Sequence, residues 1–196
     1  MRIRKSYTLP NSHIVRNCSS LRCKKSLHAH VYEIEVFFES DALDNGMMIL
    51  DFWLTKGTIK DFIGMFKNSY SMWEKESESF KDGIKKSTER WVQMPVSPSA
   101  EAYSYLFMYS IDKIIKNTVF ANWEQNVRVS SVKVHETRTG YAESFQKDLT
   151  NPKMPQFTLE DIEFSEEVIK SCKDPDMLKN LLEGVKFMND KVEQQV

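Results

Sequence analysis

Two histidines at the start of a strand-like segment constrain this chain most. His28-Ala29-His30 stands directly before residues 31–39, a run rich in β-branched and aromatic side chains that predicts a β-strand. Alternate residues of a strand point to the same face, so we expect both imidazoles to face one side. Imidazole nitrogen is a good zinc ligand, and catalytic zinc sites take three protein ligands and leave one position open. The pair therefore predicts two zinc ligands, with an ordinary pair of surface histidines on a strand edge as the alternative.

The choice of a third ligand is narrow, because the chain contains only four histidines. His13 follows the turn-like Pro10-Asn11-Ser12 and is the natural candidate. We therefore predict a metal site made of His13, His28 and His30.

Composition excludes several classes of protein. A formal net charge of −1 gives no electrostatic footprint for nucleic acid, so no nucleic-acid partner is expected. No stretch is apolar enough to span a bilayer, and residues 1–10 lack the apolar segment of a secretory signal, so no membrane partner is expected. Cys18, Cys23 and Cys172 are odd in number and irregular in spacing, which argues against a disulfide framework. They favour reduced thiols and a cytoplasmic location.

Basic side chains crowd the N-terminal stretch: Arg2, Arg4, Lys5, Arg16, Arg22, Lys24 and Lys25. Such a cluster is either an anion site, for example for substrate phosphates, or a solvated basic face. The sequence leaves both interpretations open.

The order of the periodic segments predicts an α+β fold, with an antiparallel four-stranded sheet and helices on one face. Strands are expected at residues 2–9, 31–39, 127–135 and 141–145, and residues 47–52 are expected to be extended. Helical spacing occurs at residues 55–66, 80–86 and 100–116. Ser99 is a good N-cap for the last of these helices, and the Glu101 carboxylate suits its first turn.

The character of the chain changes after Asp148. Residues 151–155 read as a linker, and residues 160–172 and 176–192 as two amphipathic helices. We therefore predict a main domain of residues 1–147 and a C-terminal helical extension of residues 148–196.

Five motifs in this order resemble those of the 6-pyruvoyl-tetrahydropterin synthase and 6-carboxytetrahydropterin synthase family. They are His13; Cys23 followed by His28-Ala29-His30; Gly46-Met47-Met48-Ile49-Leu50-Asp51-Phe52; Pro98-Ser99-Ala100-Glu101; and Val132-Lys133-Val134-His135-Glu136-Thr137. The resemblance covers roughly residues 1–147.

The resemblance implies a tunnelling fold, in which the sheets of several subunits join into a barrel, and a homo-oligomer, either a trimer or a hexamer. Active sites would lie between subunits and would hold zinc. The implied activity is that of a lyase acting on 7,8-dihydroneopterin triphosphate. In the carboxy branch, loss of the side chain and of triphosphate gives a precursor of deazapurines such as queuosine. In the pyruvoyl branch, the product leads to tetrahydrobiopterin, and the sequence does not decide between the two branches.

The resemblance also implies roles for individual residues. Cys23 would be the catalytic thiol, with Cys18 as its rival in the same loop. Glu136 would hold the aminopyrimidine edge of the pterin through paired hydrogen bonds, since a carboxylate fits that planar pair of donors. Thr137 and Ser99 would be weaker substrate contacts.

Two further side chains near these motifs are expected to support the site. Glu101 would support the pocket from the start of its helix. His135 precedes Glu136 on a strand, so its side chain should leave the opposite face, and we interpret it as structural.

The chain departs from the family at an Asp-His pair that relays protons with the cysteine. Lys67 and Asn68 stand at these positions, and no histidine lies between His30 and His135. Asparagine cannot usefully accept a proton, and general acid–base help is worth roughly 100- to 10,000-fold in rate.

Three accounts of the departure compete. In the first, which we favour, the lyase works with Cys23 and zinc-bound water, and Lys67 is a further base if it is desolvated near the metal. In the second, the chain is a repurposed relative that binds a pterin or purine-like ligand without turnover. In the third, it is a scaffold that keeps the barrel and presents its C-terminal helices.

Overall fold

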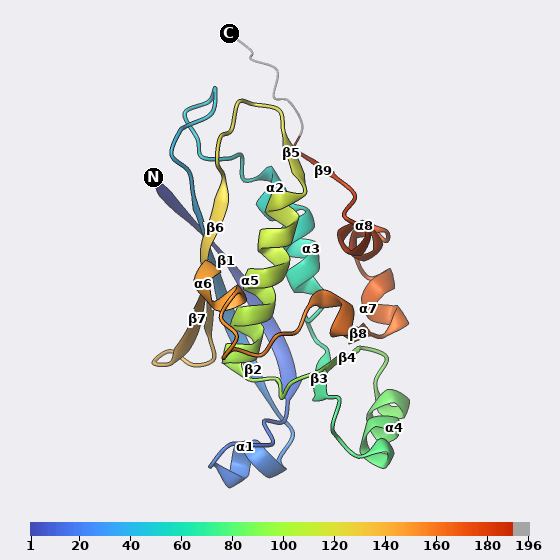
Figure 1. Cartoon of the computed structure of the whole chain (residues 1–196). Helices are drawn as coiled ribbons and strands as arrows, with labels where there is room; N and C mark the ends of the chain where they lie inside the picture. Colours follow the sequence, from blue (N-terminus) through green and yellow to red (C-terminus); the bar gives the residue numbers. More distant parts are fainter. Residues whose placement is uncertain (190–196) are drawn as a thin grey trace.

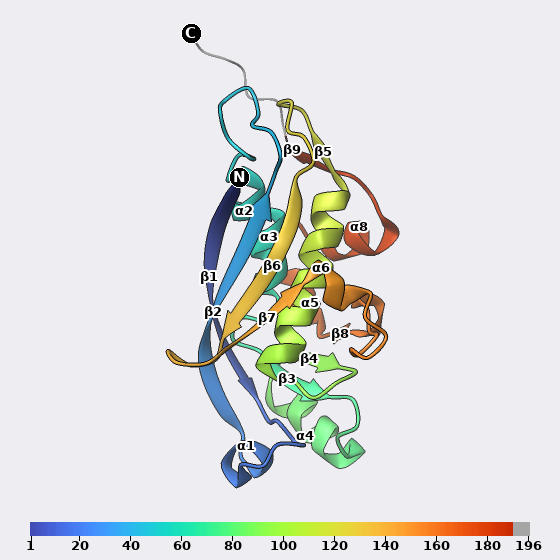
Figure 2. The same cartoon turned by 60° about the vertical axis from the view of Figure 1, so that its left-hand side comes forward.

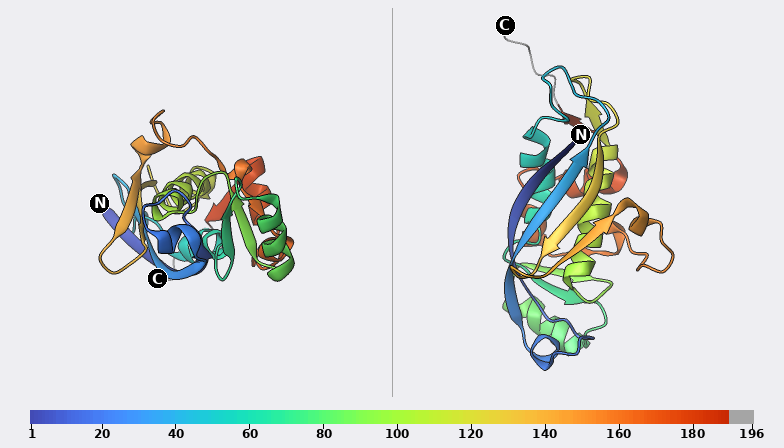
Figure 3. Two further views of the ribbon diagram at one scale, coloured as in Figure 1. Left: turned by 90° about the horizontal axis from the view of Figure 1, so that it is seen from below. Right: turned by 90° about the vertical axis from the view of Figure 1, so that its left-hand side faces the viewer.

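A seven-stranded mixed sheet forms the centre of the structure, a computed structural model that describes residues 1–189. Its antiparallel part has the order β7-β6-β2-β1, and the strands are β1 (Arg2–His13), β2 (His28–Glu39), β6 (Arg128–His135) and β7 (Tyr141–Phe145). Figure 3 shows these strands side by side, with the helices on one side of them. The predicted α+β class and the four antiparallel strands are confirmed.

Three short strands that we did not predict extend the sheet beyond β1. They are β3 (Tyr70–Trp73), β4 (Trp91–Met94) and β8 (Glu163–Phe164). β3 is parallel to β1 but pairs with it only at Ser12 and His13. Most of the outer edge of β1 therefore has no strand partner within the described residues.

The long hairpin of β1 and β2 is the element that positions the histidines. Its register runs from Arg2 opposite Glu39 to His13 opposite His28, and α1 (Leu21–Lys25) lies in the connection. On β2 the alternate side chains are fully buried: Tyr32, Ile34, Val36 and Phe38. This period of two is the expected signature of a strand whose one face is covered.

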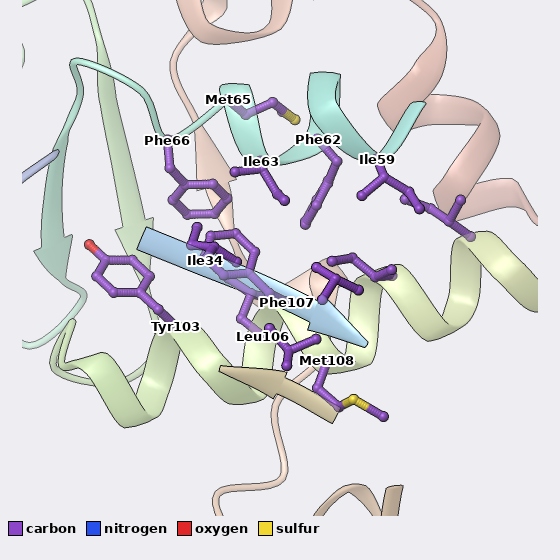
Figure 4. Close-up of a cluster of buried hydrophobic side chains, with 14 of the residues drawn as sticks. Ile34, Ile59, Phe62, Ile63, Met65, Phe66, Tyr103, Leu106, Phe107 and Met108 are labelled. Carbon is purple, nitrogen blue, oxygen red and sulfur yellow. The ribbon is translucent and has the colours of Figure 1, made fainter. Parts of the chain in front are cut away.

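The face of the sheet that carries these side chains is covered by α5 (Ala100–Lys116), which packs along β6 and β7 (Figure 2). The Ser99 side chain accepts a hydrogen bond from the Ala102 amide, which confirms the predicted N-cap. Between α5 and α3 (Thr58–Gly64), aromatic rings pack edge to face, as Phe66 and Phe107 do at a centroid distance of 5.3 Å (Figure 4).

The remaining early helices are short. They are α2 (Trp53–Lys56), α4 (Glu78–Ser87) and α6 (Gln146–Leu149). The predicted helix over 55–66 is divided, because Gly57 adopts φ −92° and ψ −114°, outside the helical region. No helix among residues 1–189 is both long and apolar enough to cross a membrane.

The expected extension of residues 47–52 is wrong, because local hydrogen bonds fold this segment into turns. The Asp44 carboxylate accepts hydrogen bonds from the amides of Gly46 and Met48, both at 2.8 Å. Such bonds from an aspartate to the following amides are typical of a turn.

The two C-terminal helices that we predicted over 160–172 and 176–192 are also wrong as continuous helices. The structure has a 3₁₀ turn (Leu159–Asp161), β8, α7 (Glu166–Lys170), α8 (Met177–Glu183) and β9 (Phe187–Asn189). β8 pairs with β4, and Gly184 ends α8 in the left-handed conformation at φ +72°. Residues 190–192 of the second prediction lie outside the described residues.

The C-terminal segment packs on the same core as the rest of the chain. Phe164, Val168 and Leu181 belong to the buried cluster that also contains α3 and α5 side chains. β9 pairs with β5 (Thr118–Phe120), which follows α5 directly (Figure 1).

Candidate metal centre

The register of the β1–β2 hairpin brings three histidines together at one end of the sheet. His13 lies directly opposite His28, and His30 follows two residues later on the same face. His13 is the last residue of β1, and not part of a bend after Pro10 as we expected. The three histidines therefore converge because paired residues of neighbouring strands share a face.

The ligand atoms of the three imidazoles lie within 4.8 Å of one another. The Nε2 atoms of His13 and His28 are 3.1 Å apart. Two nitrogen ligands of a tetrahedral zinc ion, each about 2.0–2.1 Å from the metal, lie about 3.3 Å apart. The spacing of the side chains thus fits a single divalent cation.

Hydrogen bonds to the main chain set the tautomers of two of these rings. His13 Nδ1 donates to the carbonyl of Pro98, and His28 Nδ1 donates to the carbonyl of Ser26 at 2.9 Å. Because a carbonyl only accepts, each Nδ1 carries the proton and each Nε2 keeps its lone pair. Two lone pairs that face each other at 3.1 Å repel unless a cation lies between them, and this donor set is the one that metal-binding histidines use.

Burial keeps the His13 ring neutral. The side chain is fully buried, and burial lowers the pKa of His13 to about 4, to which the neighbouring His28 and His30 also contribute. A neutral imidazole is the form that binds a metal.

Glu136 faces the same cluster from the end of β6. Its Oε1 lies 3.5 Å from His30 Nε2 and 3.7 Å from His13 Nε2, and its side chain is about one-third exposed. The carboxylate is therefore close to the histidines and partly open to solvent, where it is able to contact a metal or a molecule that approaches the metal.

Comparison with known proteins supports one family. The sequence model of the 6-pyruvoyl tetrahydropterin synthase family matches residues 2–147. The chain belongs to this family. It is 47% identical over 152 residues to proteins named 6-carboxy-5,6,7,8-tetrahydropterin synthase in two strains of Helicobacter pylori, which covers 78% of this chain and 76% of each relative.

Solved structures of low sequence identity share the fold. A 6-pyruvoyltetrahydropterin synthase of Plasmodium vivax matches with a TM-score of 0.54 at 11% identity, over 74% of this chain and 96% of that one. An uncharacterised protein of Wolinella succinogenes matches with a TM-score of 0.57 at 18% identity, over 74% of this chain and 98% of that one. The tunnelling fold implied by the sequence motifs is therefore confirmed.

The other residues that the family motifs single out lie around the cluster rather than in it. Ser99 caps α5, directly after the Pro98 carbonyl that holds His13, and Glu101 is exposed on the first turn. Both line a cavity of about 510 Å³ beside that helix. Thr137 accepts hydrogen bonds from the amides of Thr139 and Gly140, and so shapes the β6–β7 turn.

His135 lies outside the cluster. Its Nε2 is 2.9 Å from Glu35, a carboxylate that Arg4 also binds. The ring therefore takes part in a polar network on the sheet rather than in the metal centre, as the alternation around Glu136 indicated.

Sequence analysis missed one side chain of the cluster. Tyr32 continues the alternation of His28 and His30, and its hydroxyl lies 3.2 Å from His13 Nδ1. Burial raises the pKa of Tyr32 above its usual value, so the hydroxyl stays protonated. The period of two along β2 is the signal that identifies it.

The two cysteines of the β1–β2 connection differ in their hydrogen bonds. The Cys18 thiol donates to the carbonyls of Val15 and Ser20, at 3.1 and 3.3 Å. Cys23 lies half-buried on α1, and its thiol makes no hydrogen bond to any described residue. Neither sulfur belongs to the group of three histidines.

Lys67 and Asn68 follow α3 and precede β3. Both are exposed, and the Asn68 amide donates to the Pro10 carbonyl at 2.7 Å. Asn68 adopts φ +54°, a left-handed conformation in which asparagine and histidine are both enriched. The turn therefore accommodates either residue at this position.

Proposed function

We propose that this chain is a zinc-dependent 6-carboxytetrahydropterin synthase that acts on 7,8-dihydroneopterin triphosphate, a step toward queuosine and related deazapurines. The observation that carries the proposal is the convergence of the His13, His28 and His30 nitrogens within 4.8 Å. The relatives at 47% identity favour the carboxy branch over the pyruvoyl branch.

The proposed chemistry assigns a different task to each side chain. His13, His28 and His30 hold the zinc, and bound zinc supplies Lewis acidity toward the vicinal hydroxyls of the pterin side chain. Glu136 accepts the paired N–H donors of the aminopyrimidine, which sets the side chain of the pterin beside the histidines. Cys23 moves the protons. Its thiol donates to no carbonyl of the described residues, whereas the Cys18 thiol donates to two.

A pterin-binding protein without turnover is the second candidate. It is favoured by Lys67 and Asn68, which offer no imidazole at the positions where the family has its proton relay.

Triphosphate release from 7,8-dihydroneopterin triphosphate separates the two candidates. We expect the zinc-loaded protein to release triphosphate, a chelator to stop the release, and added zinc to restore it. Pterin binding without release selects the second candidate. If neither release nor binding occurs in an intact oligomer, a scaffold role remains.

A homo-oligomer, either a trimer or a hexamer, is part of the proposal. The outer edge of β1 over residues 2–11 and the outer edge of β7 lack strand partners among residues 1–189, and such edges join readily to another copy. Light scattering should give about three or six times the chain mass of 23.0 kDa. A monomer mass at micromolar concentration would contradict this assembly.

A further inference from the structure

A second cavity lies between β1 and the helices α2 and α3. Its volume is about 350 Å³. The walls come from three parts of the chain: residues 5–9, residues 55 and 56, and residues 60, 63, 64 and 67. At about 3.3 Å per residue along β1, wall residues 5–9 lie roughly 13 to 26 Å from His13. The cavity is therefore distinct from the histidine cluster of the same chain.

The charge of this cavity has one sign. Four lysines contribute to its walls: Lys5, Lys56, Lys60 and Lys67. None of the lining residues is acidic. We call it the lysine cavity. Among residues 1–189, none of the four ammonium groups forms an ion pair with a carboxylate. Other lysines of the chain do, for example Lys113 with Glu160 and Lys116 with Asp112.

The inner wall of the lysine cavity is held in place by a buried hydrogen bond. The Tyr7 hydroxyl donates to the Thr55 carbonyl at 2.8 Å, which ties β1 to α2. Burial raises the pKa of Tyr7 above its usual value, so this donor keeps its proton. Lys5 is further oriented by the Phe52 ring, 5.6 Å from its ammonium group.

We propose that the lysine cavity binds an oligophosphate group. Four lysines without a carboxylate partner line one cavity, their like charges repel each other, and an anion that carries several charges relieves this repulsion. Lysine ammonium groups are common phosphate ligands, and the volume lies in the range of small-ligand sites. The oligophosphate is either free or part of a larger molecule, such as the triphosphate of the proposed substrate. This binding site does not depend on the proposed reaction.

Calorimetric titration of the intact protein with inorganic triphosphate tests the proposal. We expect one triphosphate per chain at low ionic strength, and at least tenfold weaker binding in the variant Lys56→Gln/Lys60→Gln. The control Lys86→Gln/Lys153→Gln removes the same charge from exposed positions outside the cavity and should bind within twofold of the parent protein. Both variants keep the three histidines, so any contribution of bound metal is the same in each.

Two results would overturn the lysine cavity as a binding site: no triphosphate binding by the parent protein, or equal losses in the two variants. Turnover kinetics identify the source of the phosphate. A raised KM for 7,8-dihydroneopterin triphosphate in the cavity variant alone supports binding of the triphosphate of the substrate. An unchanged KM together with lost triphosphate binding supports a free oligophosphate. Because the titration needs no turnover, it remains decisive if the proposed lyase activity fails.

Discussion

Replacing His28 by alanine is expected to weaken zinc binding at least about 100-fold and to abolish triphosphate release. Loss of a mere hydrogen-bond partner of a metal ligand already costs about 10- to 100-fold in affinity, and this change removes a ligand. His28 is partly exposed, so its truncation leaves the buried core intact, unlike a change at the fully buried His13. Metal content per chain by mass spectrometry and triphosphate release measure the two effects.

Glu136→Gln is the matched comparison for this experiment. The amide keeps the shape of the side chain but loses the charge and one of two acceptor oxygens. We expect full metal content and a KM about 10- to 100-fold higher, since a hydrogen bond to a charged group contributes about 1.5–3 kcal/mol. Normal zinc content and turnover in His28→Ala would refute the metal centre, whereas zinc loss in Glu136→Gln would make Glu136 a fourth ligand.

The double change Lys67→Asp/Asn68→His is expected to raise kcat about 100-fold or more. It restores a titrating imidazole and its carboxylate partner at the positions where the family has a proton relay, and general acid–base catalysis is typically worth about 100- to 10,000-fold. The fold should tolerate both changes, because both side chains are exposed and histidine accepts the left-handed conformation of Asn68.

The single change Lys67→Asp is the control for the relay, because it adds a carboxylate without an imidazole and should leave kcat unchanged. Lys67 also lines the lysine cavity, so kcat and KM have to be compared separately. If the double variant melts at the parent temperature and gains nothing in kcat, the two positions do not serve proton transfer in this chain.

The sequence was sufficient for the parts of the fold and site that depend on local periodicity. The period of two along β2 predicted that His28 and His30 share a face. Because the chain has only four histidines, His13 was the natural third ligand. The N-cap at Ser99 was predictable because capping depends on one side chain and the next three residues.

The sequence was not sufficient where distant segments pair. The position of His13 opposite His28 depends on a register across the whole hairpin, and Glu136 reaches the cluster only through the pairing of β6 with β2. The C-terminal helices were predicted too long for the same reason. Phe164 pairs with Val92 in the sheet, and no helical pattern around Phe164 shows that long-range contact.

The main-chain acceptors of His13 and His28 have a consequence for how this centre tolerates change. The carbonyls of Pro98 and Ser26 persist whatever side chains occupy those positions. A point substitution at position 98 or 26 changes the side chain but keeps the carbonyl that orients the His13 or His28 ring. Insertion or deletion of a residue between Met94 and Ser99, or next to Ser26, displaces a carbonyl and rotates a ring. The outer support of the centre is thus protected against replacement of residues and vulnerable to changes in loop length.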